Sequence, residues 1–336
     1  MRAMIPFSIL DLAHVPEGSD PADALRRSRD LAGHAERLGY RRFWMAEHHN
    51  MTGIASAATS VALAYVAEGT STIRLGAGGV MLPNHAPLVI AEQFGTLAAL
   101  YPGRIDLGVG RAPGTDQATM RALRRSLDGD VDSFPRDVVE LISYFDDPAP
   151  DQLIRAVPGA GLKVPVWMLG SSTYGAQLAA LLGLPYAFAS HFAPAQMMEA
   201  LAAYRGLFRP SAWLAQPYVM LGFNVFAAET DEEARFLHSS TQQAFVNLRT
   251  GRPGPLPRPV ENYESTLDEA GRALLRHTLS ASAVGSPETV REGLRAFIER
   301  TGADELILTG GIHDPAARLR SFEIAARARE ELAAAT

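Results

Sequence analysis

The sequence predicts an α/β fold, a (β/α)8 TIM barrel with insertions that spans residues 1–336 as one domain. Eight short apolar runs recur along the chain, and runs of this length and composition are typical of buried parallel strands. Helical patterns separate most of them, as in parallel strands joined by crossover helices. No domain break interrupts the alternation, which favours a closed barrel. Because periodicity cannot show closure, an open doubly wound sheet stays the alternative.

The expected strands are apolar runs bounded by polar or turn-forming residues. In chain order they are Ile5–Leu12, Arg42–Glu47, Ile73–Leu82, Ile105–Gly110, Val164–Leu169, Tyr186–Ser190, Tyr218–Ala227 and Glu305–Thr309. The first expected helix follows Asp20-Pro21, a capping residue with proline at the first helical position, and Gly39 ends it. Further helical patterns cover 87–101, 173–182, 194–208, 230–248, 287–300 and 315–332.

Two stretches interrupt the alternation. The polar, proline-containing stretch 128–163 is predicted to be an insertion that carries a helix near 137–145. The sequence GRPGPLPRP at 251–259 can form neither a helix nor a central strand, because proline lacks the backbone donor. It lies between the last two expected strands, at the active-site end of a barrel, where it is either a mobile lid or a disordered surface loop.

Composition limits the functional class. The formal net charge is −6 and no basic block occurs, which argues against nucleic acid as a partner. The chain has no cysteine, which excludes disulfides, thiolate metal sites and cysteine nucleophiles. No segment approaches the roughly 20 apolar residues of a membrane span, and the start of the chain lacks the long apolar core of a signal peptide. We therefore expect a cytoplasmic protein without membrane contact.

Two of the expected strands carry residues suited to chemistry or ligand contact. The second strand runs into Glu47-His48-His49, where a histidine can act as a base or donor near neutral pH, or the residues can form a buried hydrogen-bonded pair. Because adjacent strand residues point to opposite sides, we expect no shared metal ligation and predict no metal site. The glycines at 76, 78 and 79 indicate either close approach by a planar ligand or tight packing in a barrel.

Two further strand ends are candidate anion sites. Arg111 leaves the fourth strand between glycines, suited to a bidentate phosphate contact, with a surface ion pair as the alternative. The fifth strand runs into Gly170-Ser171-Ser172 and a helix start, where free N–H groups attract an anion or the hydroxyls serve only as caps. Two anion sites and a glycine gap suggest a phosphorylated planar cofactor, and flavin mononucleotide (FMN) fits better than a dinucleotide.

At these residues the sequence resembles the bacterial luciferase-like flavin-dependent monooxygenase family. The resemblance runs from about Pro6 to Leu332 and rests on Glu47-His48-His49, Leu82-Pro83 and the stretch 103–111. It implies a (β/α)8 barrel, usually a homodimer, that binds reduced FMN or a related deazaflavin (F420).

Two departures indicate a non-luminescent member of that family. Gly110 stands where light-emitting subunits carry a cysteine near the flavin. The ordered lid of those subunits is matched only loosely by residues 245–285. We therefore do not expect light emission from a long-chain aldehyde.

The resemblance also implies the site residues by position. His48 resembles the active-site histidine beside the flavin, and Gly78-Gly79 falls where many members have a non-prolyl cis peptide under the ring. His191 and Asn224, at the sixth and seventh strands, are expected to face the substrate. The cofactor-binding residues that the resemblance implies are Gly78 and Gly79 at the ring, Pro113 and Gly114 at the flavin edge, and Arg111, Ser171, Ser172 and Gly175 at the phosphate.

The leading functional hypothesis is a monooxygenase for a small organic substrate. Reduced FMN from a separate flavin reductase would react with O2 to a C4a-peroxyflavin, and His48 would hydrogen-bond that adduct or move its proton. One alternative is an F420-dependent hydride-transfer oxidoreductase. Others are a flavin-binding protein without catalysis and a metal-dependent barrel hydrolase. The substrate depends on loops near 190–196 and 245–285 whose shapes the pattern does not fix.

Overall fold

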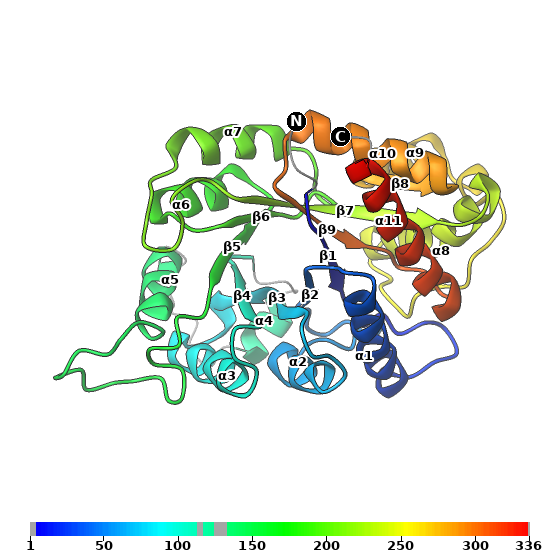
Figure 1. The fold of residues 1–336 in the computed structure, drawn as a ribbon. Coiled ribbons are helices and arrows are strands. Elements are labelled where there is room, and N and C mark those ends of the chain that lie inside the picture. The colour runs from blue at the N-terminus through cyan, green and yellow to red at the C-terminus, as the bar shows by residue number, and fades with distance from the viewer. Residues whose placement is uncertain (1–4, 113–116, 124–132, 335–336) are drawn as a thin grey trace.

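The computed structural model describes residues 5–112, 117–123 and 133–334, and its strands close into a parallel barrel. Each strand pairs with the next, and the last pairs with the first (Figure 1). Around the barrel they are β1 (Phe7–Asp11), β2 (Arg42–Met45), β3 (Arg74–Met81), β4 (Ile105–Gly110), β5 (Val166–Gly170), β6 (Tyr186–Phe188), β7 (Val219–Ala227) and β9 (Glu305–Thr309). The predicted (β/α)8 TIM barrel and its eight strands are confirmed, and the open-sheet alternative is wrong.

The helices surround this barrel (Figure 1). They are α1 (Pro21–Arg37), α2 (Thr59–Ala67), α3 (Pro87–Leu100), α4 (Gln117–Leu123), α5 (Phe134–Ser143), α6 (Thr173–Leu182), α7 (Met197–Leu207), α8 (Asp231–Arg249), α9 (Glu269–Thr278), α10 (Pro287–Thr301) and α11 (Pro315–Ala334). The predicted start of α1 is confirmed, because the Asp20 carboxylate accepts from the Asp23 N–H at 2.8 Å. Among the described residues, no helix combines the length and apolar character that crossing a bilayer requires.

A ninth strand, β8 (Ser282–Gly285), was not predicted. The short β6 pairs only with the first residues of β7, Val219 to Leu221, which leaves the end of β7 open on that side. There β8 pairs with residues 224–227 of β7. The strand carries only two apolar residues between serine and glycine, so its sequence gives no periodic signal.

The proline-rich segment 251–259 is neither helix nor strand, as predicted, yet it is held in place. Leu256 is buried, and its N–H donates to Val15 O at 2.8 Å while its carbonyl accepts from Glu17 N at 2.9 Å. These bonds tie the segment to the loop after β1, which rules out the disordered-loop alternative. In the insertion, α5 confirms the helix predicted near 137–145, and 124–132 lie outside the described residues.

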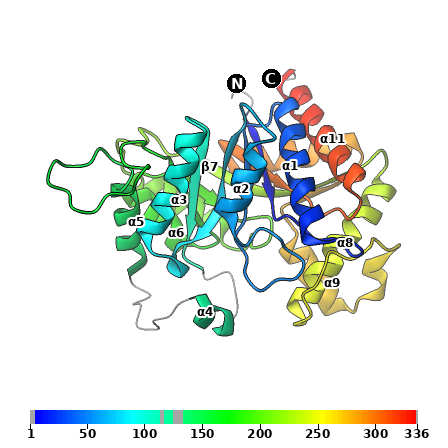
Figure 2. The ribbon, with the colours of Figure 1, turned by 90° about the horizontal axis from the view of Figure 1, so that it is seen from below.

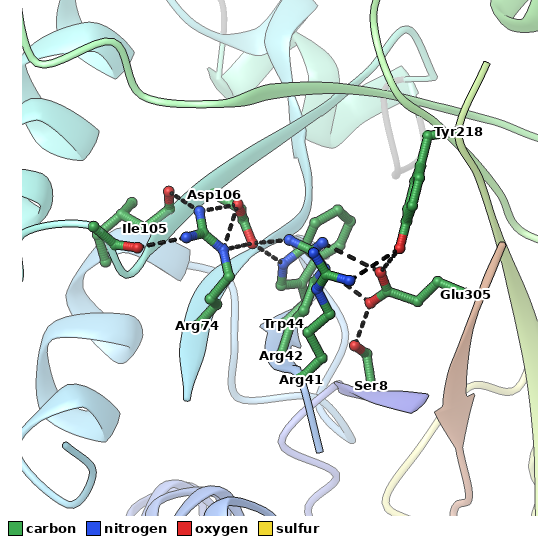
Figure 3. A network of polar contacts seen from close by, with 10 residues as sticks. Ser8, Arg41, Arg42, Trp44, Arg74, Ile105, Asp106, Tyr218 and Glu305 are labelled. Carbon is green, nitrogen blue, oxygen red and sulfur yellow. Dashed lines mark hydrogen bonds and ion pairs between the residues drawn. The ribbon is translucent and has the colours of Figure 1, made fainter. Parts of the chain in front are cut away.

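A buried ion network closes the barrel at the amino ends of its strands (Figure 3). The Arg42 guanidinium lies 2.7 Å from an Asp106 oxygen and 2.8 Å from a Glu305 oxygen. Arg74 adds a second cation to Asp106, and the Tyr218 hydroxyl donates to Glu305 at 2.8 Å. Burial alone would lower the pKa of Arg42, but the Asp106 and Glu305 carboxylates outweigh it and raise that pKa. The floor of the barrel is therefore fully occupied by paired charges.

Above the floor, Trp44 fills the middle of the barrel. Its ring meets Trp167 edge-on, with ring centroids 5.3 Å apart. A Cβ added at Gly76 would lie 2.5 Å from the indole nitrogen of Trp44, and one at Gly78 would lie 3.1 Å from its ring. A Cβ at Gly108 would lie 2.3 Å from the Ala77 carbonyl oxygen. Because glycine has no Cβ, β3 and β4 can pack closely against each other and against the Trp44 indole.

Candidate active site at the carboxyl ends of the strands

Because charges and indoles fill the lower barrel, a ligand can enter only at the carboxyl ends of the strands, where barrel enzymes place their sites. Figure 2 shows α4 and α9 at one end of the molecule, opposite the two termini. The sequence-predicted residues follow the strands at their carboxyl ends: His48 after β2, Arg111 after β4, Ser171 and Ser172 after β5, and His191 after β6.

Glu47 binds two histidines at this end. His49 Nε2 lies 2.7 Å from Glu47 Oε1, and His85 Nε2 lies 2.9 Å from the same oxygen. The Met81 N–H donates to Glu47 Oε2 at 3.3 Å and so fixes the carboxylate from below. Burial alone would raise the pKa of Glu47, but the hydrogen bonds and charges of His85 and His49 outweigh it and lower that pKa. The carboxylate is thus ionised at neutral pH.

Sequence reasoning missed His85. It follows the 3-10 turn η1 (Leu82–Asn84) directly after β3, so it reaches Glu47 from the neighbouring strand end. The sequence signal that could have identified His85 is its position within a few residues of the carboxyl end of an expected strand. The buried hydrogen-bonded arrangement considered for Glu47 and His49 is confirmed, with His85 as its third member.

Two half-buried histidines, His14 and His191, lie within electrostatic reach of His48. Burial, then the Arg318 charge, lowers the pKa of His14 to about 4, with Asp11 opposing and His48 adding to the shift. Burial, then the His48 charge, lowers the pKa of His191 to about 4. Both rings are therefore neutral at neutral pH. The Nδ1 atoms of His14 and His191 have no hydrogen-bond partner among the described residues.

Asn224 holds the segment that carries His191. Its amide nitrogen donates to the His191 carbonyl at 2.6 Å, to the Ala281 carbonyl at 3.3 Å and to the Ser282 hydroxyl at 3.1 Å. A Cβ at Gly222 would lie 2.2 Å from His191 Nδ1, so the imidazole packs directly on β7. Asn224 therefore positions His191, and substrate contact by either residue stays a prediction.

The two predicted anion sites meet at α6. The Arg111 guanidinium carbon lies 4.1 Å from the centre of the Tyr174 ring, in the first turn of that helix. Ser172 occupies the N-cap position but makes no side-chain capping bond, which leaves the capping-only alternative for this residue unsupported. Exposed N–H groups at a helix start beside an arginine suit a phosphate.

Closely packed glycines of β3, joined by a cis peptide bond, lie beneath this site. The Gly78–Gly79 peptide bond is cis, as the resemblance implies. A Cβ at Gly78 would lie 2.8 Å from Leu10, and one at Gly79 would lie 2.8 Å from the Gly108 carbonyl oxygen, which confirms tight packing in the barrel. At Gly175 a Cβ would meet only ordinary contacts. Pro113 and Gly114 lie outside the described residues.

Comparison with known proteins agrees with this geometry. The family model described as luciferase-like monooxygenase matches residues 5–305. A luciferase-like monooxygenase of Escherichia coli (strain K12) is 57% identical over 328 residues, covering 98% of each chain. The N-acetyl-S-alkylcysteine monooxygenase of Bacillus subtilis (strain 168) is 40% identical over 255 residues, which are 74% of this chain and 75% of that protein.

A solved structure agrees as well. The crystal structure of apo-MsnO8 is 36% identical, superposes with a TM-score of 0.86, and covers 97% of this chain and 98% of that chain. The match extends through the barrel and the strand ends that carry the site. The protein is an oxidoreductase, and the chain belongs to the luciferase-like monooxygenase family.

Proposed function

We propose that this protein is a reduced-FMN-dependent monooxygenase that activates O2 at the flavin C4a position and oxidises a small organic substrate. The observation that supports it best is the stacking of Arg111 on Tyr174 beside the uncapped start of α6. The Arg111 guanidinium and the backbone N–H groups at the start of α6 lie side by side, which suits binding of a single phosphate such as that of FMN. Bound reduced FMN would supply the electrons for oxygen activation.

We infer the contacts of such a cofactor from the residues that the resemblance implies. Arg111, Ser171, Ser172 and Gly175 would bind the phosphate, and the backbone at 78–79 would lie under the ring. The phosphate contacts supply orientation rather than chemistry. Pro113 and Gly114, which lie outside the described residues, would complete the contacts at the flavin edge.

His48 is the proposed catalytic residue. It lies close enough to His14 and His191 for its charge to disfavour protonation of both rings. Those two rings stay neutral at neutral pH. The proton-transfer role is therefore assigned to His48, which would donate a proton to an oxygen atom above the flavin ring. The closed floor of the barrel excludes water from below, which protects a reactive oxygen species.

The remaining parts of the proposal concern the source of reduced FMN, the oligomeric state and the approach of the substrate. Reduced FMN would come from a separate flavin reductase, and the enzyme would work as a cytoplasmic homodimer. The substrate would approach His191 from the open end of the barrel. The sulfur-containing substrate named for the Bacillus subtilis relative makes small thioethers the first class to screen.

The test is to mix the protein with anaerobically reduced FMN, admit O2 and follow the flavin absorbance rapidly. A transient species that outlives the oxidation of free FMN supports the proposal, and it should vanish in Arg111→Ala at limiting FMN. Oxidation indistinguishable from free FMN contradicts it. Substrate turnover with F420 under anaerobic conditions would then identify the hydride-transfer alternative. FMN binding without any reaction would identify a non-catalytic flavin protein.

A further inference from the structure

Glu47, His49 and His85 form a cluster with the composition of a metal site. Within residues 5–112, 117–123 and 133–334, they are the one group of His, Cys, Asp or Glu side chains whose ligand atoms gather closely enough to hold an ion. Their ligand atoms all lie within 4.8 Å of one another. Two imidazoles and a carboxylate are typical ligands of zinc and related divalent metals.

The distances in the cluster are close to those that a metal requires. Ligands about 2.1 Å from a zinc ion, at angles between 90° and 110°, lie roughly 3.0–3.4 Å from one another. Here the two imidazole nitrogens lie 2.7 and 2.9 Å from Glu47 Oε1. These two separations need to lengthen by only a few tenths of an ångström, about the thermal displacement of ordered side chains, and the ligand atoms of His49 and His85 lie within 4.8 Å of each other.

A backbone hydrogen bond and partial burial also hold the three side chains of the cluster in place. The Glu47 side chain is 3% exposed, and the Met81 N–H fixes its second oxygen. The His49 and His85 side chains are 15% and 25% exposed, so they close the cluster on the solvent side while leaving a path for an ion. Hydrogen bonds of this kind to a ligating carboxylate fix its orientation toward a metal.

We propose that Glu47, His49 and His85 form a binding site for a divalent transition metal of the zinc class. Two Nε2 atoms and one carboxylate oxygen would be its protein ligands, which leaves a fourth position open for water or another ligand. On binding, each imidazole would coordinate the metal through Nε2 and keep one proton on Nδ1, and any proton displaced from the ring would be released to solvent. This departs from the sequence-based expectation of no metal, which considered His48 with His49 and did not include His85.

The experiment uses untagged protein freed of metal by a chelator, with no flavin added. The protein is incubated with Zn2+, passed through a desalting column and measured for metal by mass spectrometry. The unmodified protein is expected to retain about one equivalent. Glu47→Gln and His85→Ala each remove a ligand, so zinc affinity should fall at least about tenfold, as measured by competition with a chromogenic chelator.

His277→Ala is the matched control, because His277 is an exposed histidine on α9, outside the cluster. It should retain zinc as the unmodified protein does. Circular dichroism verifies folding, and His85→Ala, with the most exposed of the three side chains, stays informative if Glu47→Gln does not fold. Equal zinc retention by the unmodified protein and folded His85→Ala would overturn the proposal. The cluster would then be a hydrogen-bonded triad only.

Discussion

The Arg111 guanidinium carbon lies 4.1 Å from the centre of the Tyr174 ring, which joins the end of β4 to the first turn of α6. An arginine that lies over an aromatic ring can still donate hydrogen bonds from the edges of its guanidinium. A phosphate bound there would meet the arginine and the helix N-terminus together. Loss of the arginine should therefore affect cofactor binding more than folding.

Arg111→Ala should weaken FMN binding by roughly ten- to hundredfold, since a hydrogen bond to a charged group is worth about 1.5–3 kcal/mol. Fluorescence titration with FMN measures the dissociation constant. Arg235→Ala, which removes an exposed arginine on α8, is the matched control and should bind FMN unchanged. Equal affinity in Arg111→Ala would remove this residue from the proposed phosphate site.

His48→Ala should separate binding from chemistry. The variant should bind FMN within about threefold of the unmodified protein, while substrate oxidation falls by about 10²–10⁴-fold, the usual contribution of a positioned acid or base. Single-turnover oxidation with reduced FMN and O2 measures the effect, with His277→Ala as the control. Full oxidation activity in His48→Ala would show that the proton is handled elsewhere.

Arg42→Met should destabilise the protein by about 3–5 kcal/mol, because it leaves buried Asp106 and Glu305 without their shared cation. Chemical denaturation followed by circular dichroism measures the change. The exposed pair of Arg235 with Glu232 offers the contrast, and Arg235→Ala should change stability by less than about 1 kcal/mol. Similar losses of stability in the two variants would contradict a structural role for the buried ion network at the amino ends of the strands.

Buried histidines should make the protein less stable in mild acid. Burial lowers the pKa of His238 from 6.5 to about 4, and its ring packs 4.3 Å from the Phe226 ring. The unfolded state then binds more protons between these values, so the stability from neutral His238 is complete above about pH 6.5 and is lost as pH falls through about 4.

The variant His238→Leu checks this contribution. Its unfolding free energy should depend less on pH than that of the unmodified protein, by up to about 3 kcal/mol between pH 7 and pH 4. Urea denaturation at a series of pH values gives the comparison. An unchanged pH dependence would mean that His238 is protonated equally well in the folded and unfolded states.

Local signals made most of the fold predictable. Asp20 and Gly39 mark the ends of α1 because capping and left-handed residues act over one turn, and each expected strand is an apolar run. The strand β8 escaped prediction because its pairing depends on the short length of β6, a relationship between distant segments. Propensity within one window cannot carry such information.

Candidate site residues could be named from the sequence where they stand at strand ends. His48 and Arg111 were named in this way, since both lie just beyond expected strands, and their roles stay predictions. His85 was missed because an intervening 3-10 turn separates it from β3, and His14 because the Arg318 charge that lowers its pKa comes from a segment distant in sequence. Which histidine pairs with Glu47 is a fact of three-dimensional proximity that spacing along the chain does not contain.

Trp44 also constrains the history of this chain. An alanine at position 78 would press on Leu10 and the indole, both of them side chains, so it becomes acceptable only after one of those has become smaller. At positions 76 and 108 the neighbouring backbone adds its own obstacle. A larger residue at position 78 therefore depends on a prior change at Leu10 or Trp44, whereas at positions 76 and 108 a smaller side chain alone would not make room.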